Sequence, residues 1–366
     1  MSSSNGKIKV LVVDDSAIVR KILSETISME PDMEVIGTAP DPYVARDKIL
    51  TLKPDVLTLD IEMPRMDGLT FLKKLMKFHP MPVIIISSLT KSSCEISLEA
   101  LASGAVEVME KPGGPYSIGE LREGLAQRLR AAAGARVLAP KSWVERAPVR
   151  PPDTVAMQTD KVIAIGASTG GTEAIHDVLV QLPANIPGIV ITQHIPKQFS
   201  TSFAQRLNRV CSFEVKEAQD GDVVRPGLAL LAPGDFHMVL RQSPQGYRVQ
   251  IQDGPKVCYQ RPAVDVMFAS VANVAKSHAV GVLLTGMGAD GAQGMLSMRR
   301  AGANTVAQNE ATCVVYGMPR EAVRLDAVEQ LLPLDKIAGA IVSLVSRSAP
   351  GQSVAYKWSP VTARSA

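Results

Sequence analysis

Short apolar segments alternate with amphipathic ones along the first 130 residues, and this alternation constrains the fold more than any other feature. Each apolar segment has the length of a β-strand, and the segments between them repeat apolar residues at helical spacing. Five such units predict a parallel sheet covered by helices on both faces. The predicted strands lie at Lys9–Val13, around Val35-Ile36, and at Val56–Asp60, Val83–Ser87 and Val106–Met109.

The rest of the chain predicts a linker, a second α/β domain and a tail. Residues 131–160 are rich in proline and lack periodicity, which indicates an exposed linker between a domain at 7–130 and another at 161–345. The second domain is expected to be doubly wound, with an antiparallel insertion in Phe213–Gln252, where Pro-Gly and Gln-Gly turns separate short strands. Residues 346–366 are expected to form a frayed tail.

Composition excludes several classes of protein. Hydrophobic residues make up 46% of the 366 residues, and the formal net charge of +3 is nearly balanced. This balance argues against a chain that mainly grips nucleic acid or an anionic membrane. The four cysteines are far apart and form no CxxC motif, so neither a disulfide framework nor a zinc site is expected. No signal peptide or membrane-spanning segment is apparent, and we expect a cytoplasmic protein.

Three carboxylates are predicted to meet at one edge of the first sheet. Asp14 and Asp15 follow the first strand and Asp60 ends the third, and these strands are neighbours in a flavodoxin-like sheet ordered 2-1-3-4-5. Mg²⁺ suits such a cluster, and Asp60 could carry a phosphoryl group as an acyl phosphate. Ser87 and Lys111, which end the fourth and fifth strands, could contact that phosphate. Each residue alone could be a helix cap or a surface side chain; their joint placement favours the phosphorylation site.

A glycine-rich turn follows the first strand of the second domain. Gly166, Ser168 and Gly170 match the G-x-S-x-G pattern, in which a strand enters, the backbone bends sharply and an exposed serine precedes a helix. A plain β-α turn or a phosphate-binding loop would also fit. However, Thr172 stands where a Walker loop needs lysine, and Ser168 replaces the second glycine of the dinucleotide fingerprint.

A serine hydrolase also needs a base and a carboxylate. Of the five histidines, only His194 sits at the carboxyl end of an apolar strand, and Asp290 follows another buried strand in a glycine-rich loop. Alone, either residue could be structural. Together, three strand ends offer a triad in which Asp290 orients His194 and His194 activates Ser168. The order Ser…His…Asp differs from that of the α/β-hydrolases.

The first domain resembles the receiver domains of two-component systems. The resemblance rests on Val-Asp-Asp-Ser at 13–16, on Asp60 with Met-Pro-x-Met-Asp-Gly at 63–68, on Ser87 and on Lys111-Pro112. It implies phosphorylation of Asp60 by a histidine kinase, with Mg²⁺ held by Asp14, Asp15 and Asp60. Val108 departs from the pattern, since many receivers carry an aromatic residue there that follows phosphorylation.

The second domain resembles the catalytic domain of chemotaxis protein-glutamate methylesterases, the CheB family. The matching segments are Ile-Gly-Ala-Ser-Thr-Gly-Gly at 165–171, Gln-His-Ile-Pro at 193–196 and Leu-Thr-Gly-Met-Gly-x-Asp-Gly at 284–291. The resemblance implies catalytic roles for Ser168, His194 and Asp290, with Thr169, Gly170 and Met287 as oxyanion or loop candidates. It also implies hydrolysis of glutamate methyl esters on chemoreceptor cytoplasmic helices, release of methanol, glutamine deamidation and no cofactor at the esterase site.

The sequence disfavours two other outputs for the second domain. A DNA-binding output is disfavoured because the domain has no basic recognition-helix pattern, and a nucleotide-binding output lacks its fingerprint. For the esterase, we expect the unphosphorylated receiver to pack over the Ser168 cleft and to block a bulky receptor helix. Phosphorylation would reshape the receiver surface near its last two βα units and bias this contact towards opening.

Overall fold

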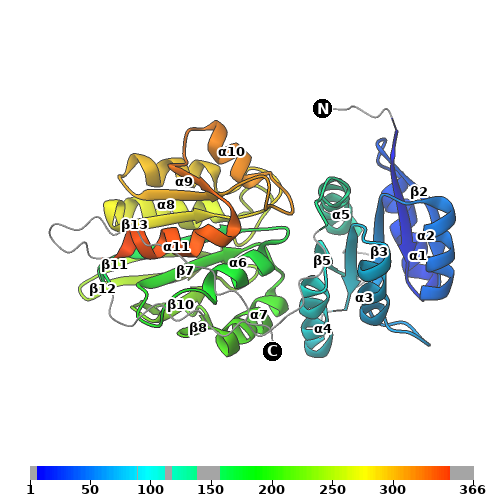
Figure 1. Ribbon diagram of the computed structural model, residues 1–366, viewed down its shortest axis with the longest axis horizontal. Coiled ribbons are helices and arrows are strands. Elements are labelled where there is room, and N and C mark those ends of the chain that lie inside the picture. Colours follow the sequence, from blue (N-terminus) through cyan, green and yellow to red (C-terminus); the bar gives the residue numbers. More distant parts are fainter. Residues whose placement is uncertain (1–5, 89, 112–117, 138–156, 347–366) are drawn as a thin grey trace, which may run out of the picture.

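The computed structural model describes residues 6–88, 90–111, 118–137 and 157–346. These residues form two α/β units that lie side by side in Figure 1, an N-terminal unit (residues 6–137) and a C-terminal unit (residues 157–346). Most of the predicted linker and tail falls at 138–156 and 347–366, outside the described residues. The predicted domain boundaries therefore stay predictions.

The N-terminal unit is a five-stranded parallel sheet in the order β2-β1-β3-β4-β5, which confirms the predicted flavodoxin-like arrangement. Its strands and helices alternate along the chain: β1 (Ile8–Val13), α1 (Ala17–Ser28), β2 (Met33–Ala39), α2 (Pro42–Leu52), β3 (Val56–Asp60), α3 (Gly68–Phe78), β4 (Val83–Ser87), α4 (Lys91–Ala102), β5 (Glu107–Glu110) and α5 (Ile118–Ala133).

Helices α1 and α3 begin at the edge of the sheet that carries the acidic residues, and a side chain caps the first turn of each. The Ser16 hydroxyl accepts a hydrogen bond from the Val19 N–H at the start of α1, and Asp67 caps α3 in the same way. The next residue, Gly68, must be glycine, because a Cβ there would lie 2.0 Å from the Asp60 carbonyl oxygen. The start of α3 thus packs directly on the backbone of the candidate phosphorylation site.

The C-terminal unit is built on a seven-stranded sheet in the order β15-β14-β13-β6-β7-β10-β8, in which every pairing is parallel. Its elements are β6 (Val162–Ala167), α6 (Gly171–Leu179), β7 (Gly188–Gln193), α7 (Lys197–Val210), β8 (Glu214–Glu217), β9 (Val223–Val224), β10 (Leu228–Leu231), β11 (His237–Ser243), β12 (Gly246–Gln252), α8 (Val264–Val274), the 3₁₀ helix η2 (Lys276–His278), β13 (Ala279–Leu283), α9 (Ala292–Arg300), β14 (Asn304–Gln308), α10 (Met318–Arg324), β15 (Gln330–Leu332) and α11 (Leu334–Val345).

An antiparallel insertion is present, but it is smaller than the sequence indicates. Strands β9, β11 and β12 form a three-stranded antiparallel sheet. The prediction that the whole of Phe213–Gln252 is antiparallel is wrong, since β8 and β10 join the large parallel sheet. The four residues of β10 are all buried, as is typical of a strand covered on both faces.

The two units pack through α4 and β5 of the N-terminal unit and α6 and α7 of the C-terminal unit (Figure 1). One hydrophobic cluster runs through the interface and contains buried residues of both units. Two arginines add polar contacts: Arg206 Nη1 donates to the Leu98 carbonyl at 2.6 Å, and Arg136 Nη1 donates to the Ala311 carbonyl at 2.7 Å. The last two βα units of the first sheet therefore face the C-terminal unit.

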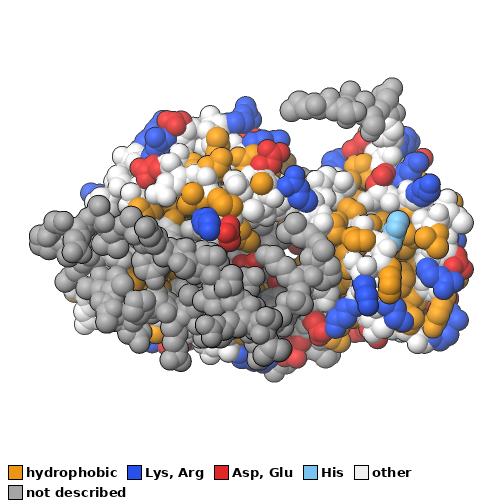
Figure 2. All heavy atoms as spheres, in the orientation of Figure 1, with side chains coloured by type: hydrophobic (Ala, Val, Ile, Leu, Met, Phe, Trp, Pro, Cys, Tyr) orange, Lys and Arg blue, Asp and Glu red, His pale blue; other side chains and the backbone are white. Residues whose placement is uncertain are grey.

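On the face shown in Figure 2, Lys and Arg side chains are interspersed with Asp and Glu among the described residues. This mixture agrees with the nearly balanced charge of the whole chain. Across the described part of the chain, no helix combines the length and the apolar character needed to cross a membrane.

Candidate active site

Ser168 lies in the tight turn between β6 and α6. Gly170 begins the helix with a positive φ of 74°, and a Cβ at this position would meet the Val314 side chain at 2.6 Å. The Ser168 carbonyl accepts a hydrogen bond from the Gly171 N–H at 2.6 Å, which closes the turn, and the Ser168 N–H donates to the Thr285 carbonyl at 3.0 Å. The turn holds the serine at the carboxyl edge of the sheet.

His194 follows β7, the neighbour of β6. The two strands are in register, with Ala167 opposite Gln193, and the His194 N–H donates to the Ala167 carbonyl at 3.2 Å. This pairing brings the imidazole against the serine: His194 Nδ1 lies 3.0 Å from Ser168 Oγ. The structure therefore joins two residues that are 26 positions apart in the sequence.

Asp290 comes from the other side of the serine, in the loop after β13, which pairs with β6. Its Oδ2 lies 2.7 Å from His194 Nε2, and the carboxylate is 2% exposed. The backbone N–H groups of Val264 and Asp265, at the start of α8, also donate to this carboxylate at 2.7 and 2.8 Å. If Nε2 carries the hydrogen that is donated to Asp290, Nδ1 is left as the basic nitrogen facing Ser168.

The remaining esterase candidates also border the serine. Thr169 is buried, and its carbonyl accepts a hydrogen bond from the Thr285 hydroxyl at 3.0 Å. Met287 follows Gly286, at which a Cβ would lie 2.8 Å from the Ser168 Cβ. Thr169, Gly170 and Met287 therefore belong to segments that meet at Ser168, and their roles at an oxyanion stay predictions.

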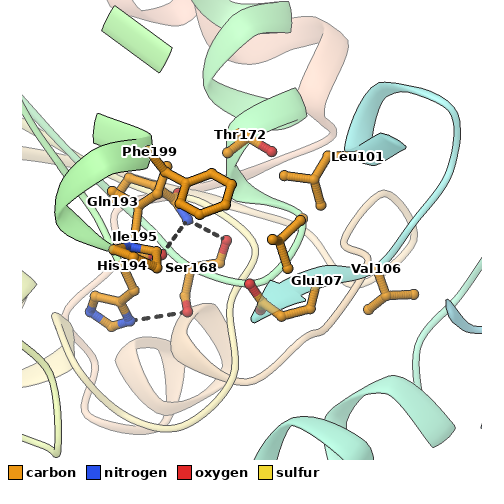
Figure 3. Close-up of a pocket in the computed structure, with 12 residues that line it drawn as sticks. Leu101, Val106, Glu107, Ser168, Thr172, Gln193, His194, Ile195 and Phe199 are labelled. Carbon is orange, nitrogen blue, oxygen red and sulfur yellow. Dashed lines mark hydrogen bonds between the residues drawn. The ribbon is translucent and has the colours of Figure 1, made fainter. Parts of the chain in front are cut away.

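A small pocket between the two units contains the candidate nucleophile and base. Figure 3 shows Ser168 and His194 on one side and Leu101, Val106 and Glu107 of the N-terminal unit on the other. Glu107 Oε2 accepts a hydrogen bond from the Thr169 hydroxyl at 2.6 Å. The space between these residues is about 20 Å³, which is room for about one water molecule.

Two residues of this site received no role from the sequence. Glu107 belongs to the N-terminal unit and contacts Thr169, which is 62 residues away in the sequence. No local sequence pattern predicts such a contact. Gln193 stands out in the sequence only as the first residue of the Gln-His-Ile-Pro segment, yet its Nε2 donates to the backbone carbonyls of Ser168 and His194 at 2.9 and 3.1 Å. Its place at the end of β7, beside His194, was the one available signal.

The acidic residues of the first sheet also meet as predicted. Carboxylate oxygens of Asp14, Asp15 and Asp60 lie within 4.8 Å of one another. Lys111 Nζ lies 2.7 Å from Asp60 Oδ2 and 3.3 Å from Asp14 Oδ2. Ser87, at the end of β4, is buried, and its hydroxyl donates to the Ser88 carbonyl at 3.3 Å.

Burial dominates the electrostatics of this acidic cluster. Burial and the nearby charge of Asp14 raise the pKa of Asp60 to about 6, against the lowering effect of Lys111. Burial also raises the pKa of Asp14. Burial alone would lower the pKa of Lys111, but its hydrogen bond to Asp60 and both carboxylate charges raise it overall. Three carboxylates face the single ammonium of Lys111, which lies 3.3 Å from the buried Asp14 Oδ2. These features fit a divalent cation.

Val108, the departure from the receiver pattern, is buried in β5 and lines the pocket between the units. It therefore lies next to the Ser168 site, in the strand that leads to Lys111.

Comparison with known proteins covers both units. A family model of the response regulator receiver domain matches residues 10–123, and one of the CheB methylesterase matches residues 163–341. The catalytic domain of the Thermotoga maritima CheB methylesterase, a crystal structure, is 37% identical, with a TM-score of 0.50 over 50% of this chain and 98% of that chain.

Curated relatives match nearly end to end. Protein-glutamate methylesterase/protein-glutamine glutaminase 2 of Syntrophus aciditrophicus is 58% identical over 93% of this chain and 99% of its own length. The protein-glutamate methylesterase/protein-glutamine glutaminase of Salmonella typhi is 52% identical over 93% of this chain and 97% of its own length. The receiver model and the methylesterase model match this chain one after the other, and the relatives match across both regions. This protein therefore belongs to the CheB family of protein-glutamate methylesterases/protein-glutamine glutaminases.

Proposed function

We propose that this protein is a phosphorylation-controlled protein-glutamate methylesterase and protein-glutamine deamidase that acts on chemoreceptors. The proposal rests on two contacts of His194 in a protein of this family. Its Nδ1 lies 3.0 Å from Ser168 Oγ, and its Nε2 lies 2.7 Å from Asp290 Oδ2. Each contact has the length of a hydrogen bond, and together they connect a nucleophile, a base and an orienting carboxylate.

The chemistry follows from these contacts. Ser168 Oγ attacks the ester carbonyl while His194 Nδ1 takes its proton, and the carboxylate of Asp290 stabilises the imidazolium. The same proton then passes to the leaving methoxide, which departs as methanol, and water hydrolyses the acyl-enzyme to the free glutamate. With a glutamine side chain, ammonia leaves instead. We assign stabilisation of the oxyanion to backbone N–H groups of Thr169, Gly170 and Met287, which border the serine.

We propose Asp60 as the phosphorylation site, with a histidine kinase as the phosphodonor. Asp14, Asp15 and Asp60 would hold Mg²⁺, and the buried Asp14 Oδ2, which has the Lys111 ammonium at 3.3 Å, would supply one ligand atom. The metal would neutralise charge on the incoming phosphoryl group. Lys111, which already contacts Asp60, would pair with the phosphate, and the Ser87 hydroxyl would donate to it.

We further propose that the N-terminal unit inhibits the esterase until Asp60 is phosphorylated. A space of about 20 Å³ over Ser168 cannot admit a glutamyl side chain, still less a receptor helix. Opening is therefore required before catalysis. A shift of the open state from about 1% to 99% needs roughly 5.5 kcal/mol, and weaker activation needs less. Phosphate at Asp60 acts through Lys111, which follows directly on β5, the strand that carries Glu107.

The proposed partners are a histidine kinase and the cytoplasmic helices of methyl-accepting chemoreceptors, and the proposed location is therefore the cytoplasm. No cofactor is assigned to the esterase site, because the serine chemistry is complete with Ser168, His194 and Asp290.

The test is methanol release from methylated receptor membranes, with and without a phosphodonor. We expect activity that rises on phosphorylation, remains low in Asp60→Asn, and is constitutively high in a folded protein that lacks residues 1–150. Absence of methanol release with every form would contradict the esterase and favour a response regulator with another α/β output. A folded truncation no faster than the unphosphorylated full chain would contradict the inhibitory packing alone.

A further inference from the structure

Gln193 is the last residue of β7, and its side-chain amide lies between the two segments that carry the nucleophile and the base (Figure 3). Its Nε2 donates to the backbone carbonyl of Ser168 at 2.9 Å and to that of His194 at 3.1 Å. The side chain is 2% exposed. Both hydrogens of one amide group are therefore used to join the serine turn to the histidine loop.

The orientation of this amide is fixed by its surroundings. Turning it over would place Oε1 against two carbonyl oxygens, which repel it. In the observed orientation Oε1 is buried and has no hydrogen-bond partner. It lies against Gly171, where a Cβ would come within 2.2 Å of it. An unpaired buried carbonyl lowers stability, which offsets part of what the two hydrogen bonds from Nε2 contribute.

We infer that Gln193 is a positioning residue for the esterase, an inference that rests on the function proposed above. Gln193 touches neither the reacting oxygen nor the imidazole nitrogens. It acts on the backbone on both sides of the Ser168 Oγ–His194 Nδ1 contact, which is 3.0 Å long. The N–H donors that it supplies hold the two residues in the geometry for proton transfer, and a shift of about 1 Å in such a geometry costs about 100-fold in rate.

The central test is Gln193→Met in the phosphorylated full chain. Methionine has a similar length, removes the unpaired carbonyl and supplies no donors. We expect kcat to fall by about tenfold or more, in line with the rate cost of misplaced catalytic groups, with KM within about twofold. We expect only a small change in Tm, because removal of the unpaired Oε1 offsets part of the loss of the two hydrogen bonds. Labelling of Ser168 by a fluorophosphonate should slow by a similar factor, because it needs the same serine–histidine contact.

The matched control is Ser270→Ala, which also removes two hydrogen bonds from the same unit. The Ser270 hydroxyl accepts from the Leu240 N–H at 2.8 Å and donates to the Met267 carbonyl at 2.6 Å, both away from the triad. We expect a lower Tm and unchanged kcat at temperatures where the variant is folded. If Gln193→Met instead loses Tm and keeps kcat, Gln193 is only a structural residue and the inference is overturned.

A second variant, Gln193→Glu, keeps the shape of the side chain and replaces its NH₂ donor group by a carboxyl oxygen. An ionised carboxylate cannot donate to the two carbonyls, whereas a protonated one regains a single donor. We therefore expect the ratio of its kcat to that of the unchanged protein to rise as the pH falls; a ratio that is constant with pH overturns the inference. If the unchanged protein released no methanol, the esterase function would fail, while fluorophosphonate labelling would still test the role of Gln193.

Discussion

Thr169 and Glu107 come from different units of the molecule, and a hydrogen bond of 2.6 Å joins the hydroxyl of the first to the carboxylate of the second. Thr169 is the residue after Ser168, so this bond ties the N-terminal unit to the turn that carries the nucleophile. Both Glu107 and Ser168 line the same small pocket. The contact offers a direct way to measure how strongly the closed arrangement is held.

Replacing Glu107 with alanine should raise the activity of the unphosphorylated protein. A hydrogen bond to a charged group contributes about 1.5–3 kcal/mol, so its loss should increase the open population by about tenfold or more where the closed state dominates. The measurement is methanol release without phosphodonor. Glu110→Ala is the matched control, because Glu110 is exposed at the other end of β5. Equal effects of the two variants would contradict a specific role for the Glu107 contact.

Ser168→Ala should abolish esterase activity and leave the fold intact, because one oxygen is removed from a polar, partly exposed site. We expect a loss of at least about 1,000-fold, and a comparable loss for His194→Ala, since the residues of a triad act as a unit. Circular dichroism and Tm provide the folding control. Normal methanol release by a folded Ser168→Ala protein would remove Ser168 as the nucleophile.

Asp290→Asn should lower both activity and stability. The carboxylate faces His194 and also accepts hydrogen bonds from two N–H groups at the start of α8. Asparagine replaces one of the two acceptor oxygens by an NH₂ group, which only donates, so it favours the wrong tautomer of His194 or leaves a backbone N–H unsatisfied. We expect a severe loss of kcat and a loss of stability of about 1–3 kcal/mol. An unchanged Tm would show that the loop does not depend on these bonds.

Removal of divalent cations should prevent phosphorylation of Asp60. Lys111 is the cation that forms ion pairs with the carboxylates of this cluster, at Asp14 and Asp60. The guanidinium of Arg20 contacts only the backbone carbonyls of Asp14 and Asp15 among the recorded contacts. Mg²⁺ supplies the missing positive charge. Incorporation of labelled phosphate should stop with EDTA and return when Mg²⁺ is added in excess. A rate that EDTA does not change would show that the acidic cluster works without a metal.

Stability should depend on pH through Asp265. Burial and the charge of Asp290 raise the pKa of Asp265 to about 6, although backbone hydrogen bonds oppose this. The folded protein therefore holds this proton more tightly than the unfolded chain, so this group's contribution to stability falls as the pH rises from about 4 to 6. Asp265→Asn should remove this component, worth about 1–3 kcal/mol, from the pH dependence of urea unfolding. Identical pH slopes for both proteins would contradict the raised pKa.

Much of the fold could be predicted from the sequence because buried parallel strands are continuous apolar runs. The order of the first sheet and the convergence of Asp14, Asp15 and Asp60 follow from such runs and from the rule that ligands bind at strand ends. The prediction was wrong where strands are short. The four residues of β10 do not indicate whether the strand runs parallel or antiparallel to its neighbour. Only its packing beside β7 in the folded chain shows that the two strands are parallel.

The candidate triad shows the same division between sequence and structure. The sequence by itself determined that Ser168, His194 and Asp290 end buried strands, because polar residues in glycine-rich turns stand out after apolar runs. Only the tertiary structure decided that β7 and β13 flank β6, which brings the side chains to 3.0 and 2.7 Å. It also decided which backbone N–H groups hold Asp290 and that Glu107 reaches Thr169. Every residue but proline carries an N–H, and a contact between units has no local pattern, so the packing of the chain alone selects these partners.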